Sequence, residues 1–194
     1  MFLDIFSRKI VGWAVFDSES AEISSVLFEN ICVANKVIKT GLILHADNGG
    51  PMKGSTMLAK LQHLGVVRSF SRAGVSDDNP FSESLFRTMK YRPGYPSKPF
   101  GNIEEARSWV EGFVNWYNTE HLHSEISFTS PANRHAGLDI EVLKKREEVY
   151  QAARAANPMR WSGQIRNWSR VEEVSLNPVS RERKPSRELL KKAA

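Results

Sequence analysis

Short apolar runs alternate with stretches of helical periodicity over the first 70 residues of this 194-residue chain. Of all the features of the sequence, this alternation most restricts the folds that the chain can adopt. Apolar, partly β-branched runs predict strands at residues 2–6, 10–16, 42–44 and 66–70. Apolar spacing predicts one helix capped by Ser18 or Ser20 and ending near Ala34, and another at residues 56–64 closed by Gly65. This order is typical of a sheet flanked by helices, so we expect an α/β domain that opens with a hairpin.

The rest of the chain is predicted to be mainly helical. Residues 71–78 lack apolar periodicity and are expected to form a flexible loop. Asn79 and Pro80 then suit the start of a helix, and Asn102 suits the start of the next one, which carries many apolar residues at core spacing. A short helix is expected from Ser130 to Gly137, followed by a charged helix at residues 139–156.

Cysteine usage and the chain start exclude several classes of protein. Cys32 is the single cysteine, so a disulfide framework and a multi-cysteine zinc site are excluded, and a reducing compartment is favoured. The apolar start is interrupted by Asp4, Arg8 and Lys9, which is unlike a signal peptide or a membrane span. We therefore expect a cytoplasmic protein with no membrane partner.

The excess positive charge lies at the C-terminal end. The chain carries a net charge of +5, and residues 160–194 hold nine basic and four acidic side chains. Such a tail is either a solvated end or an element attracted to phosphate backbones. Trp161 and Trp168 are interleaved with Arg160, Arg166 and Arg170, so this stretch either stacks on bases or anchors onto the core. Residues after Pro178 are expected to be disordered.

Two carboxylates stand in positions that suit a functional site. Asp47 follows an apolar strand, within HADNGG, where side chains reach the ligand-binding edge of a sheet, although these residues also suit a simple turn. Glu83 lies in the first turn of the helix that begins near Pro80, where it would otherwise be a solvated charge. Lys90 follows seven residues later, on the same helix face.

These blocks together resemble a known family. Three blocks occur in the same order as in the catalytic core of DDE transposases and integrases, particularly those of bacterial insertion sequences. They are HADNGG, ESLFRTMK and WYNTEHLHSEISFTSPA, and 35 residues separate Asp47 in the first block from Glu83 in the second. LDIFSRKIVGW is similar to their second and third strands, and the resemblance covers residues 2–138. It implies an RNase H-like mixed sheet flanked by helices and a metal-binding triad of two aspartates and one glutamate.

The resemblance also implies roles for individual residues. Asp47 matches the second aspartate and Glu83 the glutamate, so both are expected to bind Mg²⁺ or Mn²⁺. Lys90 matches a basic residue near substrate DNA. Further DNA contacts are expected at Arg87, Arg160 and Arg166. The implied activity is DNA cleavage and strand transfer by metal-dependent phosphoryl transfer, on transposon ends and target DNA, by a homo-oligomer associated with the bacterial nucleoid.

One part of the family pattern is not found. The first catalytic aspartate lies on a central strand that would precede residue 1, whereas Asp4 matches a non-catalytic position and is expected to end a strand or bind the following turn. We therefore expect a truncated core at residues 1–138, a charged helix and basic tail at residues 139–194, and impaired catalysis. The alternative is a non-catalytic remnant or regulator that binds DNA or intact transposase. A different RNase H-like nuclease fits the later blocks less well.

Three histidines have competing interpretations. His121 and His123 could form a zinc site, but no cysteine pair accompanies them, so packing after the last core helix is favoured. His45 either contacts the metal site or is a satisfied polar residue.

Overall fold

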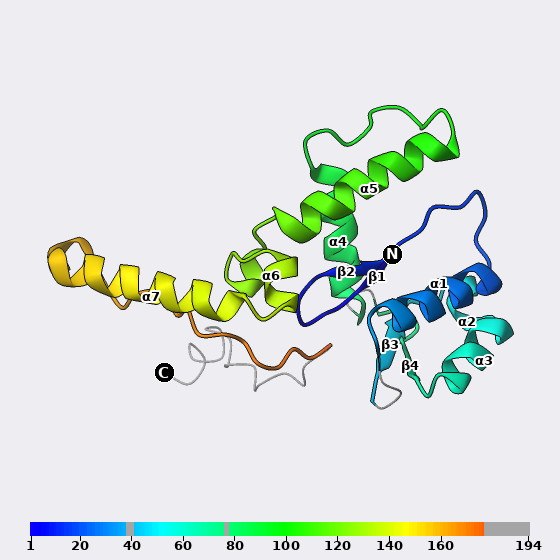
Figure 1. Ribbon diagram of the computed structural model, residues 1–194, viewed down its shortest axis with the longest axis horizontal. Coiled ribbons are helices and arrows are strands. Elements are labelled where there is room, and N and C mark those ends of the chain that lie inside the picture. The colour runs from blue at the N-terminus through cyan, green and yellow to red at the C-terminus, as the bar shows by residue number, and fades with distance from the viewer. Residues whose placement is uncertain (38–40, 76–77, 177–194) are drawn as a thin grey trace, which may run out of the picture.

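The computed structural model describes residues 1–37, 41–75 and 78–176, and it contains two short strand pairs surrounded by helices (Figure 1). Strands β1 (Phe2–Leu3) and β2 (Ile10–Gly12) pair antiparallel. Strands β3 (Ile43–Ala46) and β4 (Val67–Phe70) pair parallel. The predicted α/β class is confirmed, but the described strands form two separate sheets rather than one continuous mixed sheet.

The opening hairpin is shorter than the sequence predicted, because Asp4 ends its first strand. The Asp4 carboxylate accepts hydrogen bonds from the backbone N–H groups of Phe6 and Ser7, at 3.3 and 3.2 Å. These bonds turn the chain before residues 5 and 6 can join the ladder. Arg8 follows with a φ of 65°, a left-handed conformation at the tip of the turn.

Strand β1 separates two apolar cores. Successive side chains of a strand point to opposite faces, and accordingly Phe2 packs on one cluster while Leu3 packs on the other. The Phe2 ring lies 5.4 Å from the ring of Phe28. Figure 1 shows the β1–β2 pair between helix α1 (Ala21–Ala34) on one side and helices α4 (Pro80–Tyr91) and α5 (Ile103–Thr119) on the other.

The first core packs β3, the partner strand of β4, against three helices. Helix α1 begins as predicted, with the Ser20 hydroxyl accepting a hydrogen bond from Ile23 N at 3.1 Å. Helix α3 (Ser55–His63) ends before Gly65, whose φ of 66° confirms the predicted terminator. Helix α2 (Gly50–Lys53) was missed, because four residues carry too little periodicity to be recognised. The centre of this first core is formed by the buried residues Phe28, Cys32, Met57 and Leu61.

The second core packs α4 and α5 against the hairpin. Buried Ile10, Leu85, Val110, Phe113, Val114 and Tyr117 form it. The Asn118 side chain accepts from Ile10 N at 2.9 Å and donates to Ile10 O at 3.0 Å, which ties α5 to β2. Asn102 caps α5 as predicted, by accepting from Glu105 N at 2.8 Å. Asn79 occupies the cap position of α4, as predicted. Its side chain makes no capping hydrogen bond, so the prediction that Asn79 caps the helix is wrong.

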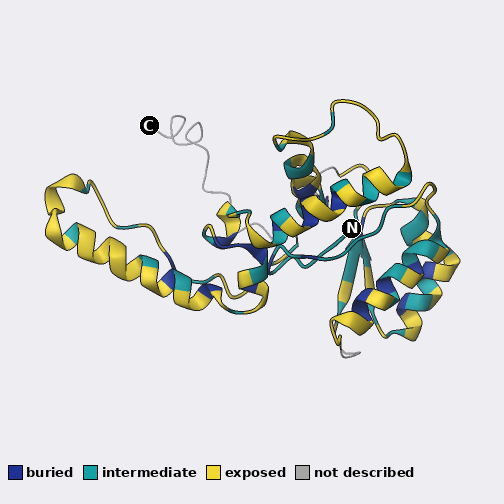
Figure 2. Ribbon diagram, turned by 45° about the horizontal axis from the view of Figure 1, so that its top comes forward, coloured by how far each residue is buried: buried dark blue, intermediate teal, exposed yellow. Residues whose placement is uncertain are grey.

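The C-terminal part of the chain extends outward along helix α7, and the segment after α7 then runs back along it. Helix α6 (Pro131–His135) and helix α7 (Asp139–Ala156) have nearly the predicted bounds, and most of α7 is exposed (Figure 2). Residues 161–176, which we call the C-terminal strap, run back beside α7. Buried Asp139 accepts hydrogen bonds from Arg134 at 3.1 Å and from Arg170 of the strap at 3.0 Å. None of the helices in the described ranges is long and apolar enough to cross a bilayer.

Candidate nucleic-acid and metal site

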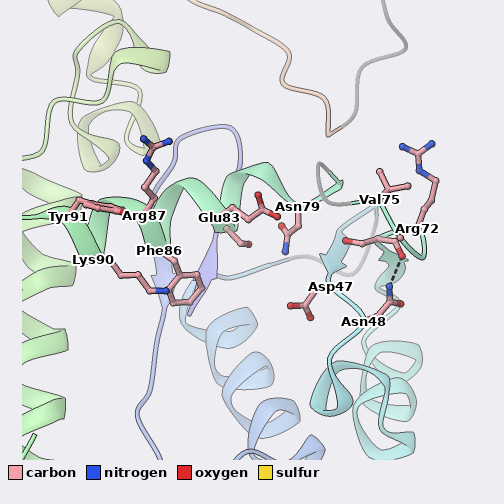
Figure 3. A pocket seen from close by; sticks show the side chains of 13 residues that line it. Asp47, Asn48, Arg72, Val75, Asn79, Glu83, Phe86, Arg87, Lys90 and Tyr91 are labelled. Carbon is pink, nitrogen blue, oxygen red and sulfur yellow. Dashed lines mark hydrogen bonds between the residues drawn. The ribbon is translucent and has the colours of Figure 1, made fainter. Parts of the chain in front are cut away.

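A cavity of about 910 Å³ opens between the ends of β3 and β4 and one face of α4. Figure 3 shows Asp47 on one side of this cavity and the α4 side chains on the other. The lining includes Asp47, Asn48, Glu83, Arg87, Lys90 and Tyr91. The structure therefore brings four of the six predicted site residues, Asp47, Glu83, Arg87 and Lys90, to one surface.

Asp47 owes its position to the parallel pairing of β3 with β4. The register pairs Ile43 with Val67 and Ala46 with Phe70, so both strands end at the same edge. Asp47 follows Ala46 directly and is exposed there. Its Oδ1 accepts a hydrogen bond from Gly49 N at 2.9 Å, as in an Asx turn. Asp47 is thus both a turn former and a carboxylate at the cavity, and the two interpretations of its sequence context are compatible.

Glu83 owes its position to helix α4. Leu85 of this helix is buried and Met89 packs against the second core. Residues 83, 87 and 90 are spaced by four and three positions, so they share the opposite, exposed face. Within the described part of the chain, the Glu83 carboxylate makes no hydrogen bond or ion pair. The cavity therefore presents two exposed carboxylates and, on α4, two exposed cations, an arrangement suited to a divalent metal ion and phosphate oxygens.

Two side-chain links hold the residues around the cavity in place. Asn48 Nδ2 donates to Ser71 O at 2.8 Å, which joins the ends of β3 and β4. Arg72 donates three hydrogen bonds to Asp78, one from its backbone N at 2.7 Å and two from its guanidinium at 2.9 and 2.7 Å. These bonds lower the pKa of Asp78 to about 2. Asp78 immediately precedes the cap position of α4, so the link sets where that helix begins.

The Arg72–Asp78 link partly corrects the predicted loop. The sequence indicated a flexible segment at residues 71–78, whereas its first and last parts are joined through the buried Asp78. Residues 76–77 lie outside the described residues. Sequence reasoning missed this link because no periodic pattern relates an arginine to an aspartate six positions later in a loop.

His45 contacts serines. Its Nδ1 lies 2.9 Å from Ser69 Oγ, and its Nε2 lies 3.4 Å from Ser71 Oγ. The first contact joins β3 to β4, and the second joins β3 to the residue that follows β4. These bonds match the interpretation of His45 as a satisfied polar residue.

Asp4 lies away from the cavity, in a hydrogen-bonded turn. Its carboxylate also contacts the Ser7 hydroxyl and His135 Nδ1, the latter at 3.2 Å. Burial raises the pKa of Asp4, but the hydrogen bonds from Ser7, Phe6 and His135 outweigh burial and lower it overall. Although serine, histidine and aspartate meet here, the same His135 nitrogen contacts both partners and Ser7 is fully buried, so the trio lacks the geometry of a nucleophilic triad. The prediction that Asp4 binds its turn is confirmed.

The histidines that follow α5 pack against aromatic rings. The His121 ring lies 5.4 Å from Tyr117 and 4.9 Å from Trp116. Burial, and next the charge of Arg8, lower the pKa of His123 to about 4. Over the described ranges, no group of three or more His, Cys, Asp or Glu side chains is arranged to hold a metal ion. The packing interpretation of His121 and His123 therefore agrees with the structure.

The C-terminal tryptophans anchor the strap. Trp168 is 7% exposed and lies 5.1 Å from the ring of Tyr150 on α7. The Arg166 guanidinium lies 4.6 Å from the Phe128 ring centroid. Neither Arg166 nor Arg160 is among the residues that line the cavity, so the structure does not join them to the other predicted DNA contacts. The tail beyond Pro178 lies outside the described residues.

Known proteins share this sequence pattern. Residues 64–131 match the family described as the integrase core domain. The chain is 32% identical over 130 residues to the transposase for insertion sequence element IS904 of Lactococcus lactis, covering 66% of this chain and 51% of that protein. It is 22% identical over 138 residues to the probable transposase for IS1353 of Shigella flexneri, covering 69% and 26%. It is 28% identical over 89 residues to the putative transposase InsK for IS150 of Escherichia coli, covering 46% and 31%. The chain thus spans about half or less of the length of these curated relatives.

Proposed function

We propose that this chain, which carries the integrase-type catalytic core of the insertion-sequence transposases, acts on DNA in transposition. The specific activity is cleavage and joining of DNA strands by phosphoryl transfer. The observation that carries this proposal is the shared cavity, in which Asp47 from the end of β3 faces a helix bearing Glu83, Arg87 and Lys90.

Asp47 and Glu83 are the proposed ligands of a divalent cation, Mg²⁺ or Mn²⁺. Their carboxylate oxygens suit such hard ions, which retain water and accept further ligands from substrate phosphates. When bound, the cation would lower the pKa of a coordinated water or hydroxyl and stabilise negative charge at phosphorus. Gly49 N orients the Asp47 carboxylate through its hydrogen bond, and α4 orients Glu83.

Lys90 and Arg87 are the proposed phosphate contacts. Both are exposed on the cavity face of α4, and phosphate oxygens accept hydrogen bonds from such cations. Arg160 and Arg166 remain proposed as secondary DNA contacts outside the cavity. Transposon ends and target DNA are the proposed substrates, and a homo-oligomer assembled on DNA is the proposed active form.

The two carboxylates favour impaired catalysis by this chain alone. Asp4 is engaged by its own turn and by His135, which leaves Asp47 and Glu83 as the acidic pair of the cavity lining. We propose that a third carboxylate, on a strand that would complete the RNase H-like sheet, is needed for full activity. The same observation favours the second candidate function, a regulator that binds DNA or intact transposase. In both cases the proposed catalytic core is residues 1–138, and residues 139–194 are its proposed appendage.

Binding of Mn²⁺ tests the metal site directly. Free Mn²⁺ is measured by electron paramagnetic resonance as protein is added, with and without duplex DNA, since phosphates contribute ligands. We expect Asp47→Asn and Glu83→Gln each to weaken the affinity about tenfold or more, because each removes one charged ligand from the site. Glu111→Gln, an exposed carboxylate on α5 outside the cavity lining, is the matched control and is expected to bind like the parent. Equal affinities for all four proteins would remove the metal site from the proposal.

A strand-transfer assay with Mg²⁺ on oligonucleotides that carry the element's ends separates the two candidate functions. We expect DNA binding with little or no joining by this chain alone. Robust joining that Asp47→Ala abolishes would contradict impaired catalysis and would point to an unrecognised third ligand.

A further inference from the structure

Tyr91, the last residue of α4, is unusually exposed for a large aromatic side chain. It is 81% exposed and lines the same cavity as Asp47 and Glu83. Tyr95, four residues later, is 44% exposed and packs edge-to-face on Trp109, with ring centroids 5.5 Å apart. Packing within the described residues therefore accounts for Tyr95 but gives Tyr91 no comparable contact.

Tyr91 continues the polar face of α4. Residues 83, 87 and 91 are spaced by four positions, so Glu83, Arg87 and Tyr91 form one row on the side opposite buried Leu85. Eight residues at the helical rise place Tyr91 about 12 Å along the axis from Glu83. Figure 3 shows the same order, with Tyr91 beyond Arg87 and Lys90 when viewed from Glu83.

The neighbours of Tyr91 suit a nucleotide. The Arg87 guanidinium lies 6.0 Å from the Tyr91 ring centroid, at the outer limit of a cation–π contact, so it covers the ring only loosely. Lys90 precedes it in the same cavity. Cations that bind phosphates, next to an aromatic ring with an open face, form the usual combination in sites for single-stranded nucleic acid.

We propose that Tyr91 forms a stacking subsite for an unpaired DNA base near the reacting phosphate. The 12 Å separation corresponds to about three or four base steps along one strand at about 3.4 Å per step. The subsite would thus select DNA whose end is frayed or single-stranded over DNA that is paired to its last base. This proposal rests on the proposed function, since it takes the carboxylates to mark the position of the reacting phosphate.

The test compares two DNA probes of equal charge. One is a duplex of about 20 base pairs, and the other has strands of the same length with about four mismatched, unpaired positions at one end, so the number of phosphates is the same in both. Affinities are measured by fluorescence anisotropy with Ca²⁺ in place of Mg²⁺. A 2-aminopurine in the unpaired stretch reports stacking, because its fluorescence falls when it lies against an aromatic ring. The proteins are the parent, Tyr91→Ala, Tyr91→Phe and Phe16→Ala, the last being a control at a 48% exposed aromatic outside the cavity lining.

We expect the parent to prefer the frayed probe and Tyr91→Ala to lose that preference. The expected loss is about 5- to 140-fold, because stacking of one base on an aromatic side chain contributes about 1–3 kcal/mol. Tyr91→Phe and Phe16→Ala are expected to keep the preference, and 2-aminopurine quenching is expected to disappear only in Tyr91→Ala. An unchanged preference in Tyr91→Ala, or no preference in the parent, would overturn the stacking subsite while leaving DNA binding intact. Absence of binding to either probe by the parent would instead overturn the proposed function.

Discussion

Replacement of Lys90 by alanine is expected to change how DNA binding depends on salt. Lys90 and Arg87 are the exposed cations on the cavity face of α4, and each can neutralise one phosphate. Each neutralised phosphate contributes about −0.9 to the slope of log K against log salt concentration for duplex DNA. Lys90→Ala should therefore make the slope shallower by about 0.9, and Lys90→Ala combined with Arg87→Ala by about 1.8.

These slopes convert into affinities that an anisotropy titration resolves. Between about 50 and 200 mM salt, one phosphate contact accounts for about a 3.5-fold loss of affinity, and two contacts account for about a 12-fold loss. Across that range, the affinity of the parent should therefore fall about 3.5-fold more than that of Lys90→Ala, and about 12-fold more than that of the double variant. Affinity of the variants should also fall by similar amounts for unrelated DNA sequences, because phosphate contacts carry no sequence information.

The control is another lysine whose charge is already paired. Lys60 on α3 donates to Glu29 at 2.7 Å and lies outside the cavity lining. Lys60→Ala removes the same formal charge, so a general effect of net charge would appear in it equally. If Lys60→Ala and Lys90→Ala change the slope alike, or if neither does, the reasoning that α4 contacts phosphates is refuted.

Two further predictions concern stability. Asp139→Ala leaves the buried guanidinium of Arg134 and that of Arg170 without their shared acceptor, so we expect the free energy of unfolding in urea to fall by about 3–5 kcal/mol, while the exposed Glu141→Ala on the same helix changes it by less than about 0.5 kcal/mol. The pKa of His123 is lowered from 6.5 to about 4 in the fold, so the unfolded chain takes up the proton first and stability should decline as pH falls from about 6.5 towards 4. His123→Gln should decline less over that window, and a parallel decline in both proteins would contradict this assignment.

Local rules predicted elements whose signals lie within a few residues of one another. Helix α7 has the bounds Asp139–Ala156, as predicted, with Asn157 and Pro158 at its C-terminal end. Asn102 caps α5 through a bond that spans three residues. Such bonds span only a few residues, so the sequence pattern can indicate them without the tertiary structure, although the cap expected from Asn79 did not form.

Elements that depend on competing or distant bonds were not predictable in the same way. Strand β1 ends early because Asp4 binds its own turn, although the apolar run continues through Ile5 and Phe6. The contact between the Arg166 guanidinium and the Phe128 ring joins residues 38 positions apart in the sequence, so no local pattern indicated it. The DNA contact expected at Arg166 stays a prediction.

For the candidate site, the sequence by itself determined the residue types and the order along α4. Glu83, Arg87 and Lys90 share a face because their spacing follows the helical repeat. Only the tertiary structure decided that Asp47 lies across the cavity from them. That placement depends on the parallel register of β3 with β4 and on the bonds between Arg72 and Asp78 that set the start of α4. These contacts join residues with no periodic relation, so their geometry emerges only when the whole chain packs.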